Sequence, residues 1–198
     1  MARDRSSRPE AKPLRLFIAV DVPEDVKSRL AASLDPFRER VSGARWTSSE
    51  GWHVTLKFLG ATWPRLVEPV RRAAKSAAAG QTSFETALTE IGAFPTRKRA
   101  RVLWAGLANP DGRFSALVAT LDELLREHFV PEKRAFTPHL TVARLNPPAN
   151  LLDAAPDLFE TLVTSRPFPV DRLVLYQSHL SPRGARYEAL DGFPLRSS

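Results

Sequence analysis

Apolar positions along this chain recur with two different periods, which predicts a mixture of strands and helices. The run from Leu16 to Val20 is continuously apolar, as in a buried strand. Residues 26–34 then carry apolar side chains at helical spacing, and we expect Pro36 to end or kink this helix. Asp21 and Glu24 lie three positions apart around a proline, a pattern that predicts a capping box at the start of the helix.

Two further segments have a helical stripe of apolar side chains. The first covers residues 66–77 and is followed by Gly80, a residue typical of helix C-termini, although Pro69 lies inside it. The second, residues 114–125, is the clearest amphipathic helix in the chain. A weaker helical pattern covers residues 156–163.

The remaining apolar stretches are short and bounded by turn residues, which predicts strands. They cover residues 44–47, 53–59, 84–91, 101–107, 139–145, 170–176 and 186–190. Residues 1–13 lack apolar periodicity and mix Arg, Ser, Pro and Glu, so we expect a disordered basic tail there. Residues 14–198 are expected to form a single domain.

Composition narrows the candidate functions. With 198 residues, 43% of them hydrophobic, the chain is long enough to bury one sizeable core. Its formal net charge of +7 favours polyanionic partners such as RNA, DNA or phosphorylated small molecules. The absence of cysteine excludes disulfides, thiolate catalysis and cysteine-ligated metals. No segment resembles a signal peptide or a membrane span, so we expect a cytoplasmic protein that does not bind membranes.

Two segments share the pattern His-x-Thr followed by an apolar residue. They are His53-Val54-Thr55-Leu56 and His139-Leu140-Thr141-Val142. Because side chains alternate faces along a strand, each His and Thr share one face while the apolar residues point into the core. Two such strands that face one another would supply an acid, a base and two hydroxyl donors.

These groups suit a displacement at phosphorus, such as the opening of a 2′,3′-cyclic phosphate at an RNA end by water. One group must take a proton from the water while another delivers a proton to the leaving oxygen. Imidazoles can do both near neutral pH because their usual pKa is about 6.5. Residues 134–144 contain no Asp or Glu, so we expect no metal site and no cofactor.

The segments around the two motifs resemble the 2H phosphoesterase superfamily. They are Gly51-Trp52-His53-Val54-Thr55-Leu56-Lys57-Phe58-Leu59-Gly60 and Phe136-Thr137-Pro138-His139-Leu140-Thr141-Val142-Ala143-Arg144. Within the superfamily the chain is similar to the bacterial and archaeal RNA 2′,3′-cyclic phosphodiesterases, historically called 2′-5′ RNA ligases. Residues 15–21, 101–106 and 180–188 add to the resemblance, which runs from about Leu14 to the C-terminus.

The resemblance implies a bilobal α+β fold, with an antiparallel sheet and flanking helices in each lobe around a central cleft. It also implies metal-independent hydrolysis of RNA or oligonucleotide 2′,3′-cyclic phosphate ends to a 2′-phosphate. By position, His53 and His139 become the catalytic pair, and Thr55 and Thr141 contact the phosphate. Our hypothesis is that His139 is the general base that activates water and His53 the general acid that protonates the 3′ oxygen.

Three further side chains are candidates for substrate binding. Phe58 is placed to stack on a nucleobase, and Arg134 and Arg144 flank the second motif and are suited to hold phosphate. Strand alternation puts Phe58 on the face opposite His53, and Arg144 opposite His139, unless the strands twist or bulge. Core packing of Phe58 and simple solvation of Arg144 therefore stay open.

Two other functions also stay open. Joining of RNA ends through a 2′-5′ bond is the reverse displacement at the same centre, and a nucleotide- or RNA-binding module could keep the fold without catalysis. We expect a monomer whose partner is RNA or an oligonucleotide with a cyclic phosphate end. His128 and His179 are interpreted as structural or surface residues, and the four tryptophans mainly as core residues.

Overall fold

The computed structural model describes residues 12–181 and 184–197. Its strands pair antiparallel in two four-stranded sheets and one two-stranded ribbon. All but the last two residues of the predicted disordered tail, residues 1–11, lie outside the described part of the chain. No helix of this part is long and apolar enough to cross a membrane.

The first sheet has the strand order β10-β9-β1-β3 and the second the order β2-β7-β6-β5. The strands of the first sheet are β1 (Leu14–Asp21), β3 (His53–Thr62), β9 (Arg172–Ser181) and β10 (Gly184–Pro194). Those of the second are β2 (Ala44–Trp46), β5 (Leu88–Phe94), β6 (Ala100–Leu107) and β7 (His139–Ala149). The ribbon joins β4 (Phe84–Thr86) to β8 (Phe168–Val170).

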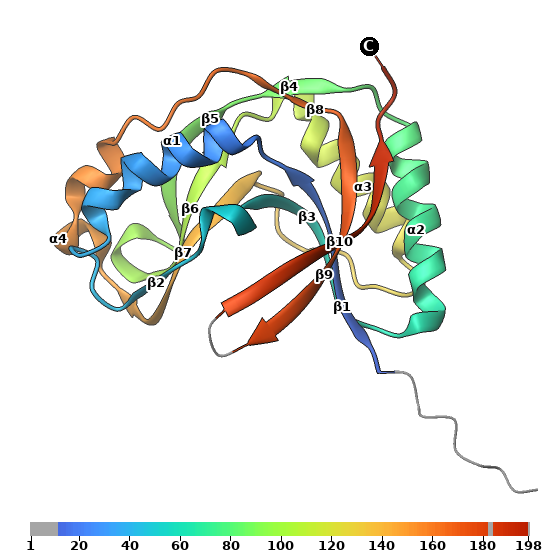
Figure 1. Ribbon diagram of the computed structural model, residues 1–198, viewed down its shortest axis with the longest axis horizontal. Coiled ribbons are helices and arrows are strands. Elements are labelled where there is room, and N and C mark those ends of the chain that lie inside the picture. Colours follow the sequence, from blue (N-terminus) through green and yellow to red (C-terminus); the bar gives the residue numbers. More distant parts are fainter. Residues whose placement is uncertain (1–11, 182–183, 198) are drawn as a thin grey trace, which may run out of the picture.

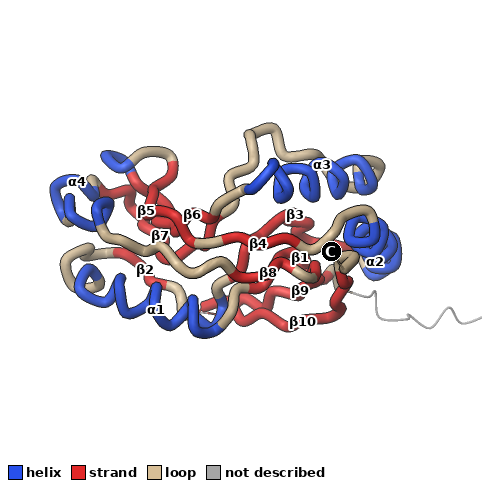
Figure 2. Tube along the Cα trace, turned by 90° about the horizontal axis from the view of Figure 1, so that it is seen from above, coloured by secondary structure: helices blue, strands red, loops and turns tan. Residues whose placement is uncertain are grey.

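Each sheet forms one lobe with its own helices (Figure 1). The helices are α1 (Glu24–Leu34), α2 (Pro64–Ala79), α3 (Arg113–Leu125) and α4 (Leu151–Ala154). In Figures 1 and 2, α2 and α3 lie beside the first sheet, and α1 and α4 beside the second. The chain therefore crosses between lobes repeatedly, and the lobes are not successive halves of the sequence.

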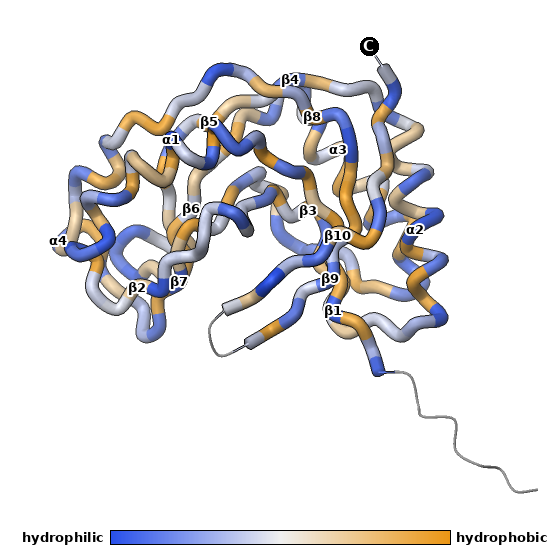
Figure 3. Tube along the Cα trace, viewed as in Figure 1, coloured by the Kyte–Doolittle hydropathy of each residue, from blue (hydrophilic) through white to orange (hydrophobic). Residues whose placement is uncertain are grey.

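A continuous cluster of buried apolar side chains spans both sheets. Residues 16–20 of β1 are at most 2% exposed, which confirms the prediction of a buried strand. Along α2, hydrophilic and hydrophobic positions alternate in Figure 3, and its apolar side packs toward β9, β10 and α3. The helices predicted at 26–34, 66–77 and 114–125 are confirmed, with Gly80 as the C-cap of the second.

Two local predictions were wrong. Asp21 and Glu24 form no capping box, because Pro23 is the N-cap and no side chain caps α1; the Asp21 carboxylate instead accepts a hydrogen bond from Tyr176. Residues 84–91 are divided between β4 and β5, which belong to different sheets. The weak helical pattern at 156–163 is confirmed over its first part, as a short 3₁₀ helix, Pro156–Glu160, preceded by α4.

Both strands that carry a His-x-Thr motif contain an extra residue just after the threonine. Consecutive residues of β1 pair with Thr55 and Lys57, so Leu56 has no partner. Consecutive residues of β6 pair with Thr141 and Ala143, so Val142 has none. Such a β-bulge places two successive side chains on the buried side and reverses the alternation of the residues that follow, up to the next irregularity, which in β3 comes at Leu59.

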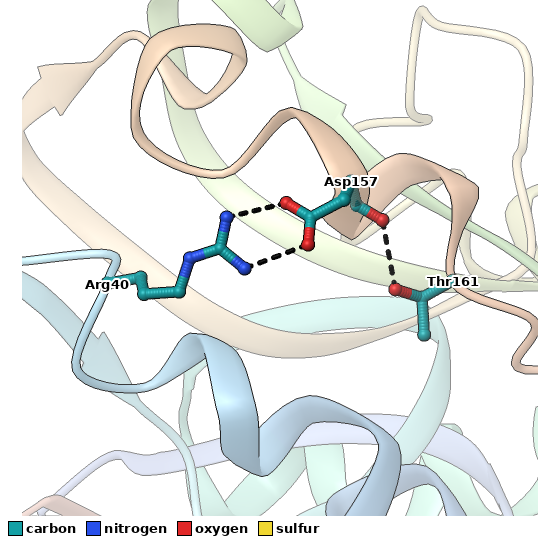
Figure 4. Close-up of polar contacts among 3 residues, drawn as sticks. All are labelled: Arg40, Asp157 and Thr161. Atoms are coloured by element: carbon teal, nitrogen blue, oxygen red, sulfur yellow. Dashed lines mark hydrogen bonds and ion pairs between the residues drawn. The ribbon is translucent and has the colours of Figure 1, made fainter.

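The bulge in β3 turns the charged side chain of Lys57 inward, where it is only 4% exposed. Its ammonium forms an ion pair with Asp122 of α3 and donates a hydrogen bond to the carbonyl of Val130 at 2.9 Å. A different ion pair lies at the surface of the other lobe, where Arg40 binds Asp157 through two bonds of 2.6 and 2.8 Å (Figure 4).

The two ion pairs should contribute very differently to stability. Asp122→Ala leaves the buried Lys57 ammonium with only a carbonyl partner, and we expect the free energy of unfolding to fall by about 3 kcal/mol. Asp157→Ala opens a pair that water solvates well, so its effect should be much smaller. Urea unfolding of both variants at pH 7 measures the difference. Equal losses would show that burial of Lys57 does not determine the energetics of the β3–α3 contact.

Candidate active site

The two histidines begin their strands, and both line one cleft of about 1000 Å³ between the lobes. His53 is the first residue of β3 and His139 the first residue of β7. Thr55 and Thr141 line the same cleft, as strand alternation predicts. The structure therefore brings together the four residues that the two motifs single out.

Both imidazoles are held in the same way by the backbone just before their strand. Nδ1 of His53 lies 2.8 Å from the carbonyl oxygen of Gly51, and Nδ1 of His139 lies 2.7 Å from that of Thr137. A carbonyl only accepts hydrogen bonds, so Nδ1 must carry the proton. The neutral tautomer then has its lone pair on Nε2, the nitrogen that can take up or deliver a proton.

Burial makes both histidines harder to protonate. Desolvation lowers the pKa of His53 from 6.5 to about 4, although the bond to Gly51 and the Asp21 carboxylate act in the opposite direction. The pKa of His139 is also lowered, first by desolvation and further by the Arg144 guanidinium. Without a bound anion, both imidazoles are therefore neutral at pH 7.

The charges next to the two histidines differ. The Asp21 carboxylate raises the pKa of His53 and the Lys27 ammonium, with a smaller effect, lowers it, whereas the Arg144 guanidinium lowers the pKa of His139. Asp21 at the end of β1 pairs in register with His53, whereas Gly106 of β6 occupies the equivalent position beside His139. A carboxylate thus favours the imidazolium of His53, and Arg144 opposes that of His139. Asp21 is held by the hydroxyl of Tyr176, which donates to it at 2.5 Å.

Aromatic rings surround His53. Phe17 stacks on its imidazole with centroids 4.6 Å apart, and the Tyr187 ring meets it edge-on at 4.9 Å. His139 has fewer close ring neighbours, with Phe94 edge-on at 5.2 Å and Trp104 at 6.1 Å. These contacts fix the ring planes, and their apolar surface accounts for much of the desolvation of both imidazoles.

Thr47 links the two motifs directly. Its hydroxyl lies 2.9 Å from the carbonyl oxygens of Thr141 and Val142, to which it donates, and it accepts a 2.7 Å hydrogen bond from Nε1 of Trp52. Trp52 is 2% exposed and directly precedes His53, which confirms the expectation that it packs in the core. The start of β3 is thereby tied to the bulge of β7.

The threonine hydroxyls are available for a ligand. Within residues 12–181 and 184–197, neither Thr55 nor Thr141 uses its side-chain hydroxyl in a hydrogen bond with the protein. Each side chain is only partly buried. A phosphate held between the histidines would thus find two unoccupied hydroxyl donors on opposite walls of the cleft.

The bulges determine which face of the strand the side chains of Phe58 and Arg144 occupy. Each lies five positions after its histidine and, because of the extra residue, faces the cleft with that histidine. Phe58 is 52% exposed, which excludes its interpretation as a core residue. One side of its ring is covered by the Arg15 guanidinium at 4.6 Å.

Arg134 differs from these residues because it does not line the cleft. It is exposed in the irregular segment before β7, where no strand pairing orients its side chain. Sequence reasoning instead missed Lys27, Arg45 and the two tyrosines, all of which line the cleft. Lys27 and the tyrosines come from segments distant in sequence from either motif, and no local pattern marks Arg45, although it lies only eight residues before His53.

The other two histidines lie outside the His-x-Thr motifs. His179 pairs with Glu188 across the β9–β10 hairpin at 2.8 Å, and His128 follows α3, where its backbone nitrogen bonds Leu125. In the described part of the chain, no three His, Asp or Glu side chains cluster so that they could hold a metal ion.

Comparison with solved structures places this fold among known ones. A crystal structure of a Thermus thermophilus protein superposes with a TM-score of 0.79 at 27% identity, covering 93% of this chain and 99% of that one. Escherichia coli LigT in complex with 3′-AMP superposes with a TM-score of 0.75 at 23% identity, covering 92% and 98% of the two chains.

Comparison with known sequences also identifies relatives of this chain. A protein of Thermotoga maritima named RNA 2′,3′-cyclic phosphodiesterase is 32% identical over 89% of this chain and 93% of its own length. A protein of the same name from Methanothermobacter thermautotrophicus is 31% identical over 92% of this chain and 99% of its own. The family model of the 2′-5′ RNA ligase superfamily matches residues 21–182 and includes both motifs. With both His-x-Thr strands inside the matched segment, the chain belongs to the 2′-5′ RNA ligase superfamily.

Proposed function

We propose that this protein hydrolyses the 2′,3′-cyclic phosphate at the end of an RNA or oligonucleotide to a 2′-phosphate, using only its own side chains. The observation that carries the proposal is the pair of histidines in one cleft. Each binds a carbonyl through Nδ1, and no group in the described part of the chain bonds its Nε2. The names of the sequence relatives support the same substrate.

In the proposed reaction, water attacks phosphorus on the side opposite the 3′ oxygen. Nε2 of His139 takes the proton from the water as the new P–O bond forms. The bond between phosphorus and the 3′ oxygen breaks, and Nε2 of His53 delivers its proton to that oxygen. The product is a 2′-phosphate with a free 3′-hydroxyl, and a proton exchange with solvent restores both imidazoles.

The remaining groups stabilise the charge that develops on the non-bridging oxygens. Hydrogen bonds from Thr55 and Thr141, together with the Arg144 guanidinium, reach the phosphate from both lobes and are fixed before the reaction begins. Phe58 offers its uncovered face to the terminal nucleobase, with Arg15 packed behind the ring. These roles fit the cleft-facing positions that the two bulges create.

The neighbouring charges support the assignment of acid and base. The acid must hold a proton before the reaction, and Asp21 favours the charged form of His53. The base must be neutral, and Arg144 disfavours the charged form of His139. A bound phosphate anion adds to the effect of Asp21 and offsets the desolvation that keeps His53 neutral in the free protein.

Ligation would be a displacement at the same phosphorus, with the 5′-hydroxyl of a second RNA in place of water. The new bond to the 5′ oxygen forms, the bond to the 3′ oxygen breaks, and a 2′-5′ linkage with a free 3′-hydroxyl results. Phe58 lines the cleft and is half exposed, so water reaches this site freely. Hydrolysis is therefore the reaction we propose. A module that only binds nucleotides would not need two histidines with free Nε2 atoms.

Loss of either histidine tests the proposed reaction. We expect His53→Asn and His139→Asn each to lower kcat at least about 100-fold on an oligonucleotide with a 2′,3′-cyclic phosphate end, assayed with excess chelator. Tight binding of the product without any turnover by the unaltered protein would support a binding module instead. Turnover that survives the double substitution would refute the mechanism.

A substrate with sulfur in place of the 3′ oxygen separates the two roles. Its thiolate leaves with little need of a proton, so the sulfur substrate should restore much of the rate of His53→Asn but not that of His139→Asn. The rates are measured in single turnover at pH 7. Rescue of the His139 variant alone would reverse the assignment of acid and base.

Asp21→Asn tests the charge that favours the acid. Both imidazoles are neutral above pH 6.5, so the fraction of molecules with a protonated His53 is small and depends directly on its pKa. The substitution keeps an oxygen that accepts from Tyr176 but removes the charge, which lowers this pKa and should lower kcat/KM at pH 7 by up to about tenfold. Lower pH should restore part of the loss, which a pH profile of kcat/KM measures.

Tyr176→Phe provides the matched comparison. It keeps the ring but removes the hydrogen bond that partly neutralises Asp21. The Asp21 charge stays, so the loss of kcat/KM at pH 7 and the pH dependence expected of Asp21→Asn should not appear. If Asp21→Asn left the pH profile unchanged, the carboxylate would have only a structural role and the argument for His53 as the acid would lose its support.

A further inference from the structure

Two arginines lie side by side on the wall of the cleft that belongs to the second sheet. Arg45 of β2 and Arg144 of β7 are directly opposite one another in the strand register. Opposed residues of an antiparallel pair point to the same face, about 5 Å apart at Cβ. Both side chains are exposed, and both line the cleft.

Like charges in directly opposed positions repel one another. In residues 12–181 and 184–197, no carboxylate lies within ion-pair distance of either arginine. Nearby Arg38 and Arg40 each have such a partner, in Asp35 and Asp157. The cleft thus holds two neighbouring cations whose repulsion a bound anion would relieve. Arg144 is assigned to one anion, the cyclic phosphate, which leaves Arg45 for another.

Arg45 also extends toward the opposite wall of the cleft. One of its terminal nitrogens, Nη2, is 3.9 Å from the position that a Cβ of Gly184 would occupy at the start of β10. Leu180, near the end of β9, pairs in register with Ala185 of β10, also lines the cleft and is 68% exposed. An unpaired cation and an exposed apolar residue thus both lie near the start of β10, and the β9–β10 hairpin projects toward β2 in Figure 1.

We propose that Arg45 and Leu180 form a subsite for the nucleotide that precedes the cyclic phosphate. Arg45 binds the phosphodiester that joins the last two nucleotides, and Leu180 packs against the ribose or base of the preceding one. The inference rests on the proposed function, because Arg144 and the histidines must hold the terminal phosphate. It makes an oligonucleotide, rather than a mononucleoside cyclic phosphate, the preferred substrate.

The experiment compares a nucleoside 2′,3′-cyclic phosphate with a dinucleotide that ends in the same group. We expect kcat/KM of the unaltered protein to be roughly tenfold to 100-fold higher for the dinucleotide, the range of a charge-assisted hydrogen bond. Arg45→Met should remove most of this ratio and reduce the dependence of log kcat/KM on log salt concentration by about 0.7 for the dinucleotide.

A dinucleotide with a neutral methylphosphonate linkage isolates the charge. The unaltered protein should lose the same advantage on it, and Arg45→Met should cause no further loss, because the two changes remove the same contact. Leu180→Asn should reduce the ratio without changing the salt dependence. Arg166→Met, which removes one exposed charge outside the cleft, is the control and should leave both substrates unaffected.

The outcomes separate the two proposals. An equal loss on both substrates in Arg45→Met, or no dinucleotide preference in the unaltered protein, would overturn the subsite. If neither substrate were hydrolysed, the proposed function would fail. The subsite would then be tested by the Kd of a dinucleotide with a 2′-phosphate end, which should rise at least about tenfold in Arg45→Met but not in Arg166→Met.

Discussion

The extra residue in each motif strand is the constraint on which the site depends. Without it, strict alternation would turn Phe58 and Arg144 away from the histidines that they follow. With it, each strand presents a histidine, a threonine and the residue five positions after the histidine on one face. The bulge in β7 is also where Thr47 binds the carbonyls of Thr141 and Val142, so the same irregularity ties the second motif to the strand start of the first.

The bulges also place two consecutive side chains of each strand on its buried face. Leu56 and Val142 are followed by Lys57 and Ala143, and all four are buried. Alanine is accommodated easily at such a position, whereas lysine needs a partner in the interior. Asp122 and the carbonyl of Val130 supply it, and in doing so they fix α3 and the segment after it against β3.

The sequence alone predicts the residue pairs but not the bulges. Histidine and threonine two positions apart share a face in any strand, so Thr55 and Thr141 follow from local geometry. A bulge depends on which residue of a distant strand is opposite. Glycine in a strand can indicate a bulge, but neither Leu56 nor Val142 is a glycine. The division of 84–91 between two sheets and the contact of Asp21 with Tyr176 were missed for the same reason, since both depend on partners remote in sequence.

The two halves of the site share geometry but differ in charge. Each histidine binds a carbonyl two residues earlier, and each strand has the same bulge, so backbone structure treats the two imidazoles alike. The side chains at equivalent positions differ. Asp21 lies beside His53 where Gly106 lies beside His139, and Arg144 follows His139 where Phe58 follows His53. A displacement at phosphorus needs opposite protonation states on its two sides, so side-chain charge has to provide the difference that the repeated backbone cannot.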